Sequence, residues 1–153
     1  MFAVVILTGC NGSLYSSKGT TITKHSNLIQ LQIGNHRGTW KTNELALNYD
    51  YQMTPEILKI SGTVNLVGGF ALCCNSVNRL VIRLVFLDSQ ETIINSVFFY
   101  SANSYHPIHM LPMNFDKTVP IPPGTNSISF DYDGELIGGA GNTSKVSIWY
   151  SPS

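Results

Sequence analysis

Two groups of residues in the sequence have the side chains needed to bind a metal ion. Asp131, Asp133 and Glu135 place three carboxylates on alternate positions, and carboxylate oxygens are preferred ligands of Ca²⁺. The stretch His106-Pro107-Ile108-His109 offers two imidazoles, but its proline excludes the helix that would align them. Asp133-Gly134 is also a typical two-residue hairpin turn, which explains that aspartate without an ion. We therefore expect loop histidines, a turn aspartate, no metal site and no cofactor.

The other reactive groups also have ordinary interpretations. Cys73 and Cys74 are adjacent and would face opposite sides of a strand, so a bond between them would strain the backbone. We expect two small, buried residues that are not bonded to each other, with a disulfide between neighbours as the alternative. The glycine-rich stretch 138–142 lacks the Lys-Ser/Thr pair of a phosphate-binding loop. No GxSxG motif is present, and no catalytic residue can be named, so the sequence predicts that the protein is not an enzyme.

Aromatic side chains are the remaining candidates for ligand contact. Trp40, Tyr105 and Trp149 are the candidate ligand-stacking residues for a carbohydrate, since amphipathic rings can stack on sugars. The alternative is that these rings pack across neighbouring strands, as most strand aromatics do.

The charge composition excludes one class of partner. Nine Lys and Arg residues balance nine Asp and Glu residues, and charged residues make up only 12% of the chain, about half the usual ~25%. A nucleic-acid-binding protein needs a basic patch that displaces counterions, and the sequence has no Lys/Arg cluster. The polar surface must instead come from 13 Asn, 16 Ser and 12 Thr residues.

The longest apolar pattern predicts the central element of the fold. Two runs rich in β-branched and aromatic residues, within Arg79 to Tyr100, flank a polar break at Asp88-Ser89-Gln90-Glu91. We expect Leu80 to Leu87 and Ile93 to Tyr100 to pair as an antiparallel hairpin. Because both faces of the first run are largely apolar, that strand should lie inside a sheet, covered on much of both sides.

Shorter strand patterns surround this hairpin. They cover Asn27 to Ile33, Leu45 to Tyr51, Ile57 to Val67, Phe115 to Ile121 as an edge strand, Ser127 to Tyr132, and Lys145 to Tyr150. Breaks are expected at Gly34 to Gly38, at Ser101 to Pro112, and at a turn at Asp133-Gly134 that leads into a return strand at Leu136-Ile137. About eight short strands without helical periodicity predict an all-β, antiparallel β-sandwich over residues 25–153, with an immunoglobulin-like topology.

The N-terminus carries a lipid-attachment pattern. The apolar run Phe2 to Leu7 leads into Leu7-Thr8-Gly9-Cys10, in which a branched aliphatic residue and two small residues precede a cysteine. This segment resembles the lipobox of bacterial lipoproteins. The resemblance implies that residues 1–9 are the truncated end of a signal peptide and that Cys10 is the lipid attachment site. Residues 10–24, rich in Gly, Ser and Thr, would then form a flexible tether.

Two functional interpretations follow. The resemblance implies a lipid-anchored protein of the bacterial cell envelope, held in the outer membrane facing the periplasm or the exterior, because Asn11 rather than Asp follows Cys10. Its sandwich would have a binding or structural role, with a protein or carbohydrate as the ligand. The alternative is a soluble extracellular binding module in which residues 2–7 form a core strand and Cys10 is an ordinary thiol.

Overall fold

The computed structural model describes residues 18–23, 27–107, 112–138 and 144–153, and it is built almost entirely of strands. The elements of the described residues are β1 (Ile29–Gln30), β2 (Gly34–Lys41), β3 (Leu45–Met53), β4 (Ile57–Leu66), α1 (Phe70–Cys73), β5 (Cys74–Leu87), β6 (Ile93–Pro107), β7 (Met113–Pro120), β8 (Ser127–Gly138) and β9 (Ser144–Tyr150). Within these residues, no helix is long and apolar enough to cross a membrane.

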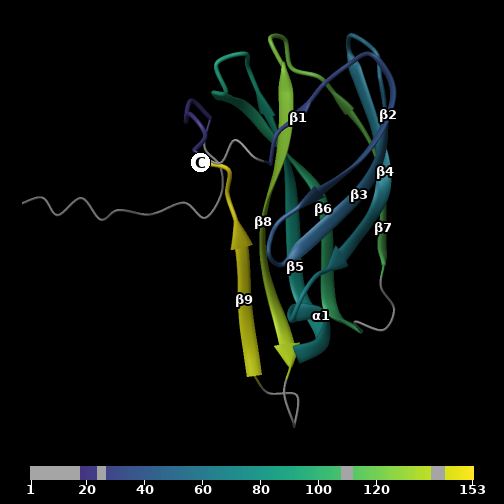
Figure 1. Ribbon diagram of the computed structural model, residues 1–153, viewed down its shortest axis with the longest axis vertical. Coiled ribbons are helices and arrows are strands. Elements are labelled where there is room, and N and C mark those ends of the chain that lie inside the picture. The colour runs from purple at the N-terminus through teal and green to yellow at the C-terminus, as the bar shows by residue number, and fades with distance from the viewer. Residues whose placement is uncertain (1–17, 24–26, 108–111, 139–143) are drawn as a thin grey trace, which may run out of the picture.

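The strands form two antiparallel sheets packed face to face, which confirms the predicted all-β sandwich (Figure 1). One sheet has the order β2-β3-β4-β7. In the other, β6 pairs with β5 and β5 with β8, while β9 and the short β1 pair with the remaining edge of β8. The chain crosses between the sheets after β1, β4, β6 and β7. The order β3-β4-β7 corresponds to strands A, B and E of an immunoglobulin-like sandwich. The order β9-β8-β5-β6 corresponds to its strands G, F, C and C′.

The predicted central hairpin is confirmed. β5 is an interior strand because it pairs with β6 on one edge and with β8 on the other. One face of β5 lies fully buried between the sheets, through Leu80, Ile82, Leu84 and Phe86. Strands alternate their side chains, so Val85 and Leu87 lie on the other face, where they are also fully buried.

A segment before the first strand covers that second face. Ile22 is buried in a small cluster with Val85, Leu87 and Ile93. The amide of Gly19 donates to the carbonyl of Ile93 at 2.7 Å, and the amide of Thr23 donates to the carbonyl of Pro152 at 3.0 Å. The prediction of a flexible tether over residues 10–24 is therefore wrong for residues 19–23, which pack on the sandwich beside the C-terminus (Figure 1).

Several predicted breaks are wrong. Gly34 to Gly38 continues as β2, which pairs with β3 residue by residue. Gly38 serves packing rather than a turn, because the ring of Tyr49 takes the space that a side chain at position 38 would need. The strand predicted at Asn27 to Ile33 shortens to Ile29–Gln30. The stretch from Ser101, predicted to be irregular, continues as strand β6 to Pro107 because it pairs along β5. The predicted edge strand is confirmed as β7, which pairs only with β4 among the described strands.

Candidate functional site

The outer face of the sheet β2-β3-β4-β7 is entirely polar over its centre. Alternation turns the apolar residues of these strands, such as Leu47, Leu58 and Phe115, into the core. The side chains on the opposite side carry amides, hydroxyls or charges and are exposed or half-buried. We call these twelve residues the polar face: Asn35, Arg37, Thr39, Asn48, Asp50, Gln52, Lys59, Ser61, Thr63, Asn114, Asp116 and Thr118.

The strand register arranges the polar face in three rows. The three rows across β2, β3, β4 and β7 are Arg37–Asp50–Ser61–Asp116, Thr39–Asn48–Thr63–Asn114 and Asn35–Gln52–Lys59–Thr118. Neighbouring strands lie ~4.8 Å apart and alternate residues along a strand ~6.7 Å apart, so the rows form a grid of about 14 by 14 Å. A regular grid of this size can contact several units of an extended ligand at once.

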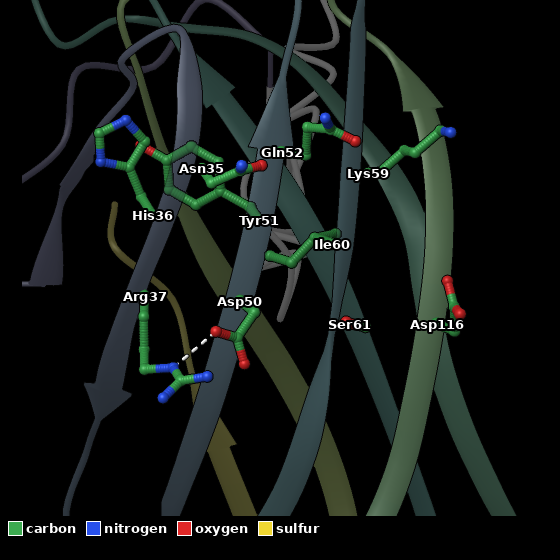
Figure 2. A pocket seen from close by; sticks show the side chains of 10 residues that line it. All are labelled: Asn35, His36, Arg37, Asp50, Tyr51, Gln52, Lys59, Ile60, Ser61 and Asp116. Carbon is green, nitrogen blue, oxygen red and sulfur yellow. Dashed lines mark hydrogen bonds and ion pairs between the residues drawn. The ribbon is translucent and has the colours of Figure 1, made fainter.

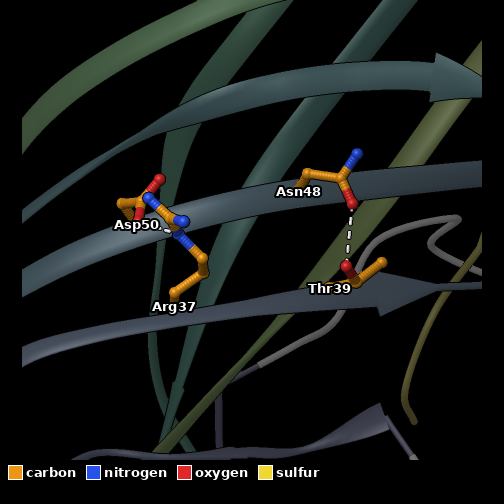
Figure 3. A network of polar contacts seen from close by, with 4 residues as sticks. All are labelled: Arg37, Thr39, Asn48 and Asp50. Carbon is orange, nitrogen blue, oxygen red and sulfur yellow. Dashed lines mark hydrogen bonds and ion pairs between the residues drawn. The ribbon is translucent and has the colours of Figure 1, made fainter.

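Direct contacts orient part of this grid. The guanidinium Nε of Arg37 donates to Asp50 Oδ1 at 2.6 Å, and Thr39 Oγ1 donates to Asn48 Oδ1 at 2.8 Å (Figure 3). The hydrogen bond and charge of Asp50 raise the pKa of Arg37. Both partners of the ion pair are well exposed, at 83% and 56%, so the pair contributes little to folding. Its effect is to hold the guanidinium group of Arg37 and the carboxylate of Asp50 in a defined position at the surface.

The sheet is hollowed at the polar face. One depression of about 680 Å³ is lined by residues of β2, β3, β4 and β7, including Arg37, Asp50, Lys59 and Asp116 (Figure 2). A second depression of about 370 Å³ continues it along the sheet and shares Arg37 and Asp50. The twelve residues carry two cations and two carboxylates. This surface therefore suits a polar ligand without net charge.

The predicted stacking residues do not come together in one site. Trp40 is buried in the core at 2% exposure, where its Nε1 donates to the carbonyl of Asn27 at 2.9 Å and its ring packs against Phe130 and Tyr150. It is therefore a packing residue, and its interpretation as a ligand contact is wrong. The side chain of Tyr105 lies outside the described residues, as do His109 and Cys10. No sequence pattern marks the polar face in a comparable way, because its members are ordinary polar residues on four separate strands.

Of the two predicted stacking residues whose side chains the structure describes, Trp149 lies at the surface. It is 56% exposed on β9 and lines a groove of about 730 Å³ between that strand and the turn from β2 to β3. At the inner side of this groove, Tyr132 donates its hydroxyl hydrogen to Glu44 Oε2 at 2.6 Å and contacts Thr42 Oγ1 at 2.7 Å. This lateral groove is a second candidate ligand site, separate from the polar face.

The buried hydroxyl of Tyr132 predicts a loss of stability in alkali. Burial, and then the hydrogen bond to Glu44, raise the pKa of Tyr132 far above its usual value of 10. Above pH 10 the unfolded chain loses this proton while the folded chain keeps it. The free energy of unfolding should therefore be fully retained below pH 10 and fall by up to ~1.4 kcal/mol per pH unit above it.

Urea unfolding between about pH 8 and 11 measures this slope, and Tyr132→Phe should reduce it at a cost of ~1 kcal/mol at neutral pH. Part of the slope should remain, because burial also raises the pKa values of Tyr49, Tyr100 and Tyr150. An unchanged slope in Tyr132→Phe would contradict the assignment.

Two of the three carboxylates that suggested calcium form ion pairs with basic side chains, and the third, Asp131, is fully buried. Asp131, Asp133 and Glu135 share the outer face of β8, which runs unbroken through the predicted Asp-Gly turn. Arg79 pairs with Asp133 at 2.7 Å, and Lys145 pairs with Glu135 at 3.1 Å. The Lys145 hydrogen bond is the main reason that the pKa of Glu135 is lowered. Among the described residues, no group of three His, Cys, Asp or Glu side chains is placed to hold a metal ion.

The predicted turn at Asp133-Gly134 is wrong because Gly134 serves a packing purpose. A Cβ atom at this position would lie 2.9 Å from the carbonyl oxygen of Arg79 and 3.2 Å from the side chain of Ile148. The glycine therefore lets β8 pass closely between β5 and β9, and Leu136-Ile137 continue the same strand rather than returning.

Comparison of the chain with models of protein families, with curated proteins and with solved structures finds no match. Function must therefore be inferred from the geometry of the polar face and of the lateral groove.

Proposed function

We propose that this chain is a lipid-anchored protein of the bacterial cell envelope whose sandwich binds a neutral, polyhydroxylated polymer, a glycan, on the polar face. The role is binding rather than catalysis. The observation that carries the proposal is the grid of amide, hydroxyl and paired charged side chains in a shallow hollow.

The chemistry of the polar face favours a sugar over other polar ligands. Amides such as Asn48 both donate and accept hydrogen bonds, as do the hydroxyls of Ser61 and Thr63, so they complement sugar hydroxyls in either direction. The short side chains of these residues lose little conformational entropy on binding. The guanidinium group of Arg37, which Asp50 already orients, can donate hydrogen bonds to two neighbouring hydroxyls. A phosphate polymer would meet the carboxylates of Asp50 and Asp116, which disfavours it.

The position of the N-terminal segment supports anchoring. Residues 19–23 pack on the outer side of the sheet that contains β5 and β6, and the polar face lies on the outer side of the other sheet. A chain that leaves the sandwich before residue 18 therefore starts from the side opposite the polar face. A tether to a lipid on Cys10 would leave that face open to a ligand.

Binding to immobilised neutral polysaccharides tests the proposed ligand class. Asn48→Ala and Asp50→Ala should each weaken binding about tenfold, since a lost hydrogen bond in a polar site costs ~1.5 kcal/mol. Trp149→Ala is the matched control, because it alters an exposed side chain on the other sheet. Affinity measured by titration calorimetry should be unchanged in this control.

The opposite result would identify the lateral groove as the site. If Trp149→Ala abolishes binding and Asp50→Ala does not, the ligand stacks on Trp149 and the polar face is not used. If the protein binds no neutral polysaccharide through either surface, the proposed ligand class is wrong.

A soluble extracellular module is the second candidate, and one observation favours it. Among the described strands, β9 pairs only with β8, so its other edge can accept a further strand. The packed segment at Thr23 lies beside Pro152, two residues after the end of β9. An apolar strand from residues 2–7 could thus be added to that sheet.

A further inference from the structure

Cys73 and Cys74 hold two free thiols in contact at one end of the sandwich. Cys74 is the first residue of β5 and is buried in the main core, whereas Cys73 is the last residue of α1 and is exposed. Their Sγ atoms are 3.0 Å apart. The prediction that they are not bonded to each other therefore agrees with the structure, but the expectation that both are buried does not.

The turn from helix to strand explains why the two sulfurs converge. Neighbours within a strand point to opposite faces, but only Cys74 has extended backbone angles, with φ −115° and ψ 149°. The backbone around them is closely packed, because a Cβ on Gly138 would lie 2.9 Å from the Cα of Cys74 and would overlap the carbonyl oxygen of Cys73. The pair is thus held in one orientation by the pairing of β5 with β8.

The short distance between the sulfurs restricts what they can chelate. At a metal–sulfur bond of ~2.3 Å, a separation of 3.0 Å corresponds to a bond angle of about 80°. Tetrahedral zinc would need the sulfurs ~3.8 Å apart and two further ligands. No group of three metal-ligating side chains exists among the described residues to supply them. A pyramidal centre with a lone pair, which bonds its ligands near right angles, fits the pair far better.

We propose that Cys73 and Cys74 form a bidentate site for a thiophilic trivalent metalloid, with trivalent arsenic as the chemical class. Soft thiolate ligands select soft centres, and two adjacent sulfurs gain from chelation. The site is independent of the polar face and of the lipid anchor.

The reaction needs no oxidant or reductant. With a monosubstituted arsenic oxide, the exposed Cys73 sulfur attacks first and forms one As–S bond. The buried Cys74 sulfur then closes the ring with a second As–S bond. The two thiol protons leave with the arsenic-bound oxygen as one water molecule, so arsenic stays trivalent. Cys74 is the ring-closing partner because it is buried in the core, whereas Cys73 is exposed to the incoming reagent.

Mass spectrometry of the intact full chain with phenylarsine oxide tests this site. The expected product carries one phenylarsenic group per chain, formed with the loss of one water molecule. It should survive excess monothiol and be reversed by 2,3-dimercaptopropanol. Cys73→Ser, which changes an exposed residue, should lose the monothiol-resistant adduct, whereas Cys10→Ser should keep it.

Other results would overturn the proposal. These are the absence of a resistant adduct, its persistence in Cys73→Ser, or untreated protein that is two hydrogens lighter because the neighbours have formed a disulfide. Near-ultraviolet circular dichroism of Cys73→Ser verifies that the variant is folded, so that loss of the adduct reports the missing sulfur.

Discussion

Replacing Gly62 with alanine should lower the free energy of unfolding by about 3 kcal/mol or more. Gly62 lies on β4 opposite Tyr49 of β3 and Phe115 of β7. An added Cβ would overlap the backbone carbonyl oxygen of Asn48 and lie 2.9 Å from the ring of Phe115. The clash is with backbone on a paired strand, so relief requires the strands to separate. Because Ser61 and Thr63 flank this position, the same change should also distort the polar face.

Gly69 provides the matched control for this substitution. It precedes α1 with φ −62°, and nothing lies within 4 Å of an added Cβ. Gly69→Ala should therefore change the urea unfolding midpoint by less than the equivalent of ~0.5 kcal/mol. Equal stability of the two variants would show that β3 and β4 are not paired as described.

Removing residues 1–17 should leave the sandwich folded, whereas removing residues 1–23 should destabilise it by on the order of 5 kcal/mol. The longer deletion removes the buried side chain of Ile22 and the backbone hydrogen bonds of Gly19, Ile22 and Thr23. It also exposes Val85 and Leu87, which Ile22 covers. Thermal unfolding of residues 18–153 should be cooperative, with a midpoint close to that of the full chain.

The shorter deletion also distinguishes the hypothesis of a lipid anchor from that of a core strand at residues 2–7. If residues 2–7 form a strand of the sandwich, residues 18–153 should aggregate or unfold, because several apolar side chains at ~1.5–3 kcal/mol each would be lost. If Cys10 is the lipid attachment site, the Cys10→Ser variant, expressed in bacteria with a complete signal peptide, should no longer be found in the membrane fraction. The variant protein should nevertheless stay folded. A Cys10→Ser protein that stays with the membrane would contradict the anchor.

The alternation of side chains along the strands was sufficient to predict much of the fold. Period-two patterns identified β3, β4 and β9, because each of these strands has one face in the core and a more exposed face opposite. The same alternation identified β8, although both faces of that strand are largely buried. The two apolar faces of β5 predicted its interior position. Glycines misled the prediction at Gly38 and Gly134, where the missing side chain makes room for a neighbour rather than for a turn. That neighbour lies on another strand, so the local pattern does not reveal it.

Sequence alone determined the composition of the surface and the types of reactive side chain, because these depend only on which residues are present. Tertiary structure decided how they are grouped. Trp40 and Trp149 are alike in sequence, but only Trp40 lies between the sheets. Asp50 and Asp116 join one row of the polar face because β4 pairs with β3 on one edge and with β7 on the other. Pairing between strands distant in the chain depends on the burial of both sheets together, which no single stretch of sequence specifies.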